Sequence, residues 1–208
     1  LISESLSILG MLIAKDPQNA GWLQMLFKAQ SIRLSMIPQS EWTRSHGAEI
    51  DQLNASLAEL SVQDPSNSKT KTISAAVMRE KALRALQAGT PSVALTPAKN
   101  AYVLTRDLVK TSDPSPQLLI QLAKSAELLG SAMVANQQTG AAESVWRETV
   151  ELLDKQNIVV FDFYPVQYLL AIDLKQADKA KEIEKKLEQA GFKDPRMQPA
   201  HTQSGTLR

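Results

Sequence analysis

Few side chains in this sequence could perform acid–base or metal chemistry. The two histidines, His46 and His201, lie far apart in the chain, and cysteine is absent, which excludes disulfides, thiolate metal sites and a cysteine nucleophile. The sequence contains no glycine-rich phosphate loop, no Gly-x-Ser-x-Gly elbow and no His-Glu-x-x-His run. It therefore predicts a protein that is not an enzyme, with no catalytic residue, no metal site and no cofactor.

Two neighbouring segments carry opposite charge. Residues 41–64 hold five acidic side chains against Arg44 alone, a net charge of −4, and residues 69–84 hold five basic side chains against Glu80 alone, a net charge of +4. In antiparallel helices these charges would either pair across the boundary or form opposed patches that steer a charged partner. The basic candidates for partner binding are Arg79, Lys81 and Arg84. The whole chain has a net charge of +1, so we expect no nucleic-acid partner.

Large aromatic side chains are the other candidates for partner binding, because such residues anchor many protein interfaces. They are Trp22, Trp42, Phe161, Phe163 and Tyr164. The last three fall within 158–164, a segment rich in β-branched and aromatic residues with no partner strand nearby. We interpret this segment as an extended connector packed on apolar surface. The alternative is an aromatic lining for a ligand groove.

A short turn that occurs three times organises the elements carrying these residues. The copies are Asp16-Pro17-Gln18-Asn19, Asp64-Pro65-Ser66-Asn67 and Asp113-Pro114-Ser115-Pro116. The steps between them are 48 residues, from Asp16 to Asp64, and 49 residues, from Asp64 to Asp113. Proline pushes the preceding residue out of the helical region, so a helix ends there. Asn19 and Asn67 can then cap a new helix, and Pro116 suits the first turn of one.

The runs between the turns have helical periodicity. Trp22, Met25, Ala29, Ile32 and Met36 follow steps of 3, 4, 3 and 4, which predicts an amphipathic helix. We expect Ser40 to cap the next helix. A later helix should end at Gly89, followed by a connector over 89–96, with Thr96 capping a helix that starts at Pro97.

The pattern predicts an all-α fold, a right-handed superhelical array of antiparallel helix hairpins with about nine helices. The array should span residues 1–192, and residues 193–208 should form an irregular tail. The chain opens without Met in the apolar run Leu1–Ala14, from which we expect a fragment of a longer protein. No apolar run approaches the roughly 18 residues that a membrane span needs, so we expect no span.

The chain resembles the tetratricopeptide repeat family, whose helix–turn–helix units often end in an Asp-Pro-x-Asn-like turn. The segment Gly140-Ala141-Ala142-Glu143, followed by Trp146 and Leu153, looks like the start of a second repeat helix. The family period is 34 residues, against 48 and 49 here. The texture is also similar to repeat regions of bacterial membrane-anchored regulators. That likeness implies the extracytoplasmic side of an inner membrane, with the cytoplasm as the alternative.

These features favour binding over catalysis. Stacked hairpins bury a continuous core and leave a concave face. We expect a non-catalytic scaffold that binds a peptide or protein segment in that face, with apolar anchors and charges setting the register. Two alternatives stay open. The chain could be a self-associating structural or assembly subunit that forms a homo-oligomer, or a small-molecule sensor domain of a larger regulator.

Overall fold

The computed structural model describes residues 1–111, 114–155, 170–172 and 174–189. In these residues the regular structure is entirely helical, with eight α-helices and one 3₁₀ helix, which confirms the all-α prediction and fits about nine helices. The elements are α1 (Ile2–Lys15), α2 (Ala20–Ser35), η1 (Gln39–Glu41), α3 (Arg44–Gln63), α4 (Ser68–Gln87), α5 (Pro91–Thr111), α6 (Pro116–Ala135), α7 (Thr139–Asp154) and α9 (Ala177–Gln189).

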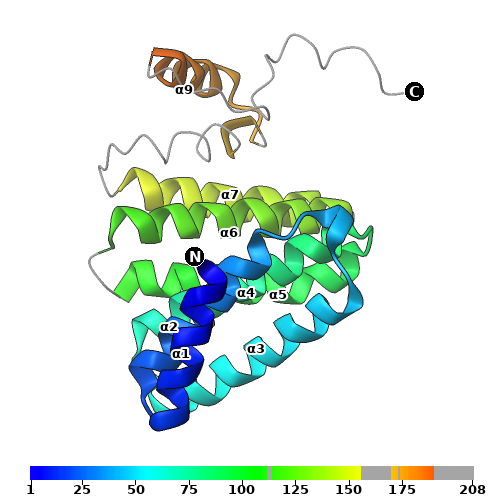
Figure 1. Cartoon of the computed structure of the whole chain (residues 1–208). Helices are drawn as coiled ribbons and strands as arrows, with labels where there is room; N and C mark the ends of the chain where they lie inside the picture. The colour runs from blue at the N-terminus through cyan, green and yellow to red at the C-terminus, as the bar shows by residue number, and fades with distance from the viewer. Residues whose placement is uncertain (112–113, 156–169, 173, 190–208) are drawn as a thin grey trace.

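Each α-helix from α1 to α6 contacts the next α-helix along the chain, and Figure 1 shows α6 and α7 lying side by side. In addition, α4 packs against both α2 and α6, so these three helices form an inner row. No comparable packing joins α3 to α5 or α5 to α7 in the described part of the chain. Helix α4 therefore lies at the centre, in contact with α2, α3, α5 and α6. The right-handed sense of a superhelix stays a prediction.

The first two Asp-Pro turns have the same backbone geometry. Asp16 and Asp64 end their helices at φ/ψ of −144°/85° and −137°/84°, and Asn19 and Asn67 start the next at −70°/95° and −68°/102°. Each Asn accepts a hydrogen bond from the backbone N–H three residues on, at 3.1 and 3.0 Å, which confirms both predicted caps. Each also donates a side-chain hydrogen bond to its Asp, at 3.2 and 3.1 Å. The sequence repeat is thus a structural repeat.

The third turn begins at Asp113, which lies outside the described residues, but its second half is seen. Pro116 is the first residue of α6, as predicted, and the Ser115 side chain accepts a 3.3 Å hydrogen bond from the Leu118 N–H. This cap suits proline at the first helical position, where no backbone donor is needed.

Two predicted helix starts are wrong. Helix α5 begins at Pro91 rather than Pro97, because Gly89 (φ +71°) ends α4 sharply and Pro91 already occupies a first-turn position. Pro97 lies buried inside α5, at the loss of one backbone hydrogen bond. Ser40 does not cap an α-helix, since it lies in η1. Helix α3 follows Thr43, whose N–H donates to His46 Nδ1 at 3.1 Å.

The core has two main clusters. The larger joins α4 to α7 around Leu122, Leu129 and Trp146, and the smaller joins α2 to α4 around Leu34 and Leu57. In the described part of the chain one helix, α6, is long and apolar enough to cross a membrane by length and composition alone. This is weak evidence for a span, because 56% of its most apolar window is buried inside the structure, and the absence of a span stays a prediction.

Gly130 of α6 sets how closely α7 can approach. An added Cβ would collide with Nε1 and Cε2 of Trp146, so the indole covers the space that any side chain would need. Trp146 is 4% exposed, and its Nε1 has no hydrogen-bond partner among the described residues. The contact is therefore a steric fit between a ring and a bare backbone.

We predict opposite effects for alanine at two helical glycines. Gly130→Ala should lower the free energy of unfolding by about 1–3 kcal/mol, because the Trp146 ring must move. Gly47→Ala in α3, where a Cβ would meet nothing within 4 Å, should raise it by about 1 kcal/mol through helix propensity. Urea unfolding measures both, and equal shifts in one direction would contradict the packing described.

Candidate protein-interaction surface

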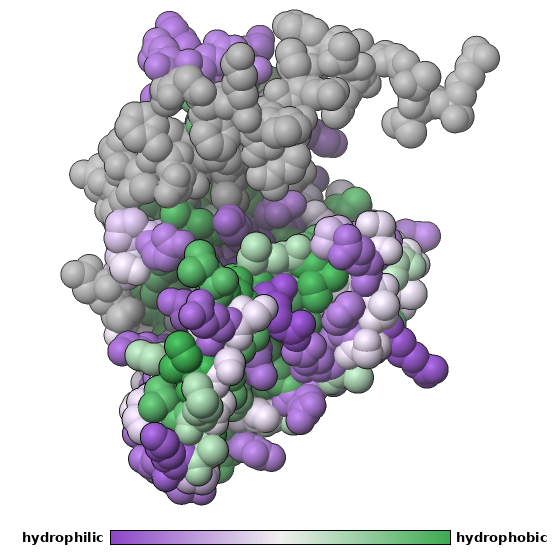
Figure 2. Space-filling model, in the orientation of Figure 1, coloured by the Kyte–Doolittle hydropathy of each residue, from purple (hydrophilic) through white to green (hydrophobic). Residues whose placement is uncertain are grey.

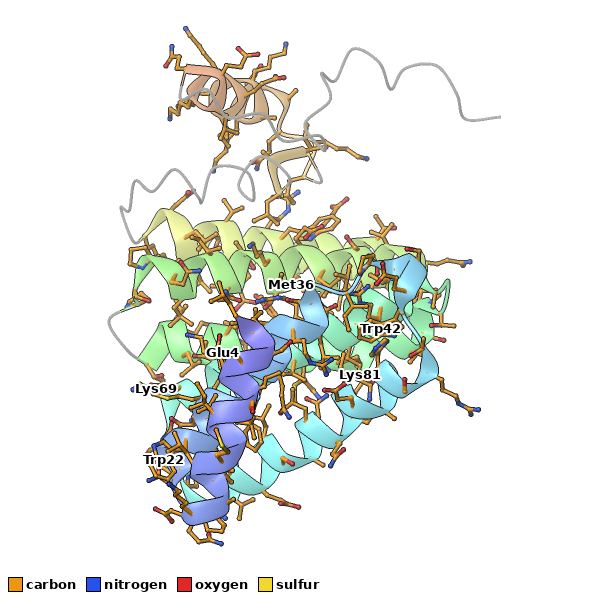
Figure 3. All side chains as sticks on the ribbon, viewed as in Figure 1. Glu4, Trp22, Met36, Trp42, Lys69 and Lys81 are labelled. Atoms are coloured by element: carbon orange, nitrogen blue, oxygen red, sulfur yellow. The ribbon has the colours of Figure 1, made fainter. Side chains whose placement is uncertain are left out.

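Helix α2 carries apolar residues on two opposite faces. The inward face contributes buried Phe27 and Leu34, with Leu23 and Leu26 partly buried against the same cluster. The stripe identified in the sequence faces outward instead. Its exposed members are Met25 (61%), Ile32 (43%) and Met36 (68%), while Trp22 and Ala29 are half-buried. Figure 3 labels Trp22 and Met36 toward opposite ends of this helix.

Helix α1, which packs against α2, also has exposed apolar residues. It has no buried residue, although Ile2, Leu6 and Leu9 are half-buried on one side. On the other side Ile8 is 48% exposed and Met11 is 59% exposed. Figure 2 shows apolar side chains at the surface where α1 and α2 lie.

We define the α1–α2 apolar face by five exposed residues on two helices. They are Ile8, Met11, Met25, Ile32 and Met36. Apart from Leu1, the other large apolar side chains that are exposed in the described residues lie elsewhere along the chain: Val62, Leu83, Val93, Val134 and Ile172. Single exposed apolar residues are ordinary on protein surfaces, whereas a group of them on adjacent helices makes this face a candidate for protein binding.

Arg84 of α4, a predicted partner-binding residue, is 9% exposed and bonded within the chain. Its Nη2 donates to the carbonyl oxygens of Ile37 (2.7 Å) and Leu34 (3.4 Å) at the end of α2. Its Nε donates to Glu80 at 2.7 Å. The guanidinium also lies 4.2 Å from the ring centroid of Trp42, a cation–π distance. Arg84 thus joins α4 to the end of α2 and to the segment before α3.

Trp42, another predicted anchor, is the partner that covers Arg84. Its half-buried side chain packs on the α2–α4 cluster, and its ring centroid lies 5.4 Å from that of His46. His46 accepts the Thr43 N–H at the start of α3. The only described histidine therefore has a helix-capping contact.

The remaining basic candidates contact different neighbours from the same helix. Arg79 donates to Gln121 of α6, and burial lowers the pKa of Arg79 to about 10. Lys81, labelled in Figure 3, pairs with Asp51 of α3. Together with Arg84, these side chains join α4 to three helices. The charge pairing expected between 41–64 and 69–84 is thus seen at Lys81, while Glu49 pairs with Arg33 of α2.

A polar cluster connects α5 to α7. Glu148 accepts hydrogen bonds from Tyr102 (3.1 Å) and Lys110 (3.0 Å), and Arg106 lies 3.9 Å away. Burial raises the pKa of Tyr102 to about 12. Burial also acts to raise the pKa of Glu148, but the hydrogen bonds from Lys110 and Tyr102 and the two positive charges outweigh it and lower that pKa. Long side chains thus bridge two helices whose backbones do not pack together.

Several predicted features lie outside the described residues: Phe161, Phe163, Tyr164, His201, the connector 158–164 and the tail 193–208. The described part contains no group of three or more His, Asp or Glu side chains that could hold a metal ion. A shallow pocket between α7 and α9 is lined by Val150, Leu153 and Ala171, among others. Its lining includes one acid–base pair, Asp154 with Lys179, at 3.3 Å.

Comparisons with protein-family models, characterised proteins and solved structures give no match to this chain. Sequence analysis named Trp22 but missed the exposed methionines as a group, although Met25, Ile32 and Met36 belong to the stripe it identified. The missing information was which side of α2 the fold buries.

We predict that Arg84→Lys lowers the free energy of unfolding by about 2–3 kcal/mol. Lysine keeps the charge but lacks the planar fork that reaches two carbonyls and stacks on Trp42. Arg44→Lys, at an exposed position of α3, is the matched control and should change it by less than about 0.5 kcal/mol. Similar urea midpoints for the two variants would exclude a structural role for the Arg84 fork.

The pH dependence of stability should report the Tyr102–Glu148 cluster. The Glu148 contribution is present above its unfolded pKa of 4.5 and is lost as the pH falls through its lowered folded pKa. The Tyr102 contribution is present below 10.0 and is lost as the pH rises toward about 12. Glu148→Gln should therefore make the free energy of unfolding less dependent on pH in acid, and Tyr102→Phe should do the same in alkali. Unfolding curves across pH check this, and an unchanged pH dependence in these variants would contradict it.

Proposed function

We propose that this chain is a non-catalytic protein-interaction scaffold that binds an apolar helical segment of a protein on the α1–α2 apolar face. The observation that carries the proposal is the second, outward stripe of α2. A helix that completes its core contacts on one side needs no large apolar residues on the other. Keeping Met25, Ile32 and Met36 there exposes apolar surface that association would remove from water.

The position of α2 in the inner row supports the same reading. Within the inner row, α4 has a neighbour on each side, namely α2 and α6. Helix α2 lies at the end of this row in the described part of the chain, with α4 as its one neighbour within the row. A further helix laid on the outward side of α2 would extend the row. Helix-in-groove recognition uses such a geometry, with apolar anchors repeating at three- and four-residue steps.

The side chains of the face favour an adaptable apolar partner. Three of its five residues are methionine, which fits irregular apolar surfaces through its flexible, polarisable side chain. In α1 only Glu4 and Lys15 are charged. The partner segment should therefore present leucine-like side chains with few charges. Docking in a concave groove, the tetratricopeptide kinship and attachment to a bacterial regulator remain parts of the proposal.

Paired variants test the surface directly. Met25→Glu/Ile32→Glu places two charges on the face, and Val62→Glu/Val93→Glu places two at exposed apolar positions outside it. Both proteins should stay folded, because all four side chains are exposed. In affinity capture from a lysate, a protein retained by the parent and by the control pair should be lost from the face variant. Equal retention of the captured protein by the parent and by the face variant would contradict the proposed site.

A further inference from the structure

The outward side of α1 carries a stripe with opposite charges at its two ends. Glu4, Ile8, Met11 and Lys15 follow steps of 4, 3 and 4, and all four are exposed. At about 100° per residue they fall within a sector of roughly 60°. The stripe lies opposite the half-buried side formed by Ile2, Leu6, Leu9 and Ile13.

The charged and apolar residues of this stripe match those of a second, antiparallel copy of the same stripe. A second α1 laid antiparallel, with the crossing point between Leu9 and Gly10, brings Glu4 opposite Lys15 of the second copy. The same register brings Ile8 opposite Met11 of the second copy. A two-fold axis repeats each pair, which is the property of an isologous interface. A parallel arrangement would instead place Glu4 beside Glu4 and Lys15 beside Lys15.

The two charges have no partner of their own in the described part of the chain. Neither Glu4 nor Lys15 forms an ion pair there, although Arg33, Lys81 and Lys110 each do. One flank of the stripe consists of exposed small residues: Ser3, Ser7, Gly10 and Ala14. A Cβ at Gly10 would meet nothing within 4 Å, so a second backbone can approach closely there.

We propose that the chain forms a homodimer in which α1 packs antiparallel on α1 of a second copy, with the exposed methionines of α2 extending the contact. This inference rests on the proposed function, since it names the occupant of the α1–α2 apolar face. We expect a contact made mainly by two 14-residue helices to bury less area than the roughly 1,200 Å² of a stable complex. The dimer is therefore weak and depends on concentration.

Sedimentation equilibrium over a wide range of protein concentration, at low salt, tests the dimer and its register. Glu4→Lys and Lys15→Glu should each weaken the association by about three- to tenfold, because each creates two like-charge contacts. The double variant Glu4→Lys/Lys15→Glu should restore it. If only the dipole of α1 mattered, the double variant would not restore the association but weaken it further, since the swapped charges oppose the dipole at both ends. Met11→Glu should abolish the dimer, and Val62→Glu should leave it unchanged.

The other outcomes separate this inference from the proposed function. A parent chain that stays monomeric at every concentration, yet still loses a captured protein on Met25→Glu/Ile32→Glu, overturns the homodimer and leaves the scaffold proposal standing. A dimer unaffected by Met11→Glu or by either single charge reversal overturns the α1 interface. A monomer that also captures nothing in a face-dependent way overturns both.

Discussion

The contact between Arg84 and the last turn of α2 is the interaction on which the arrangement of the N-terminal half depends. Arg84 is anchored on the central helix α4 and donates to the carbonyl oxygens of Leu34, in the last turn of α2, and of Ile37, just after it. Trp42 covers the guanidinium and continues into the capped start of α3. One buried side chain therefore contacts both the end of α2 and the segment that leads into α3.

The rotation of α2 decides which apolar surface remains for binding. With Phe27 and Leu34 turned toward α3 and α4, the stripe from Met25 to Met36 must point away from the core. Helix α1 packs beside α2 without burying any of its own residues, so it adds to this surface rather than closing it. The binding proposal thus follows from how the core is built.

Local features were the ones the sequence could predict. The Asp-Pro turns and their Asn caps depend on neighbouring residues only, so Asn19, Asn67 and Pro116 lie where their chemistry requires. The outward face of α2 could not be predicted, because apolar residues at helical spacing occur on both of its sides. The role of Arg84 was equally hidden, since its partners lie about 45 residues away. The helix start predicted at Pro97 was wrong because tertiary packing holds α5 together across this proline.

Methionine oxidation footprinting tests whether the α1–α2 apolar face binds a partner, because this face already carries oxidisable methionines. In dilute protein Met11, Met25 and Met36 should oxidise faster than the half-buried Met78 and Met133. We expect that raising the protein concentration, or adding a captured protein, selectively slows oxidation of the first three. Oxidation rates on the α1–α2 apolar face that never change would contradict the claim that this face is built for association.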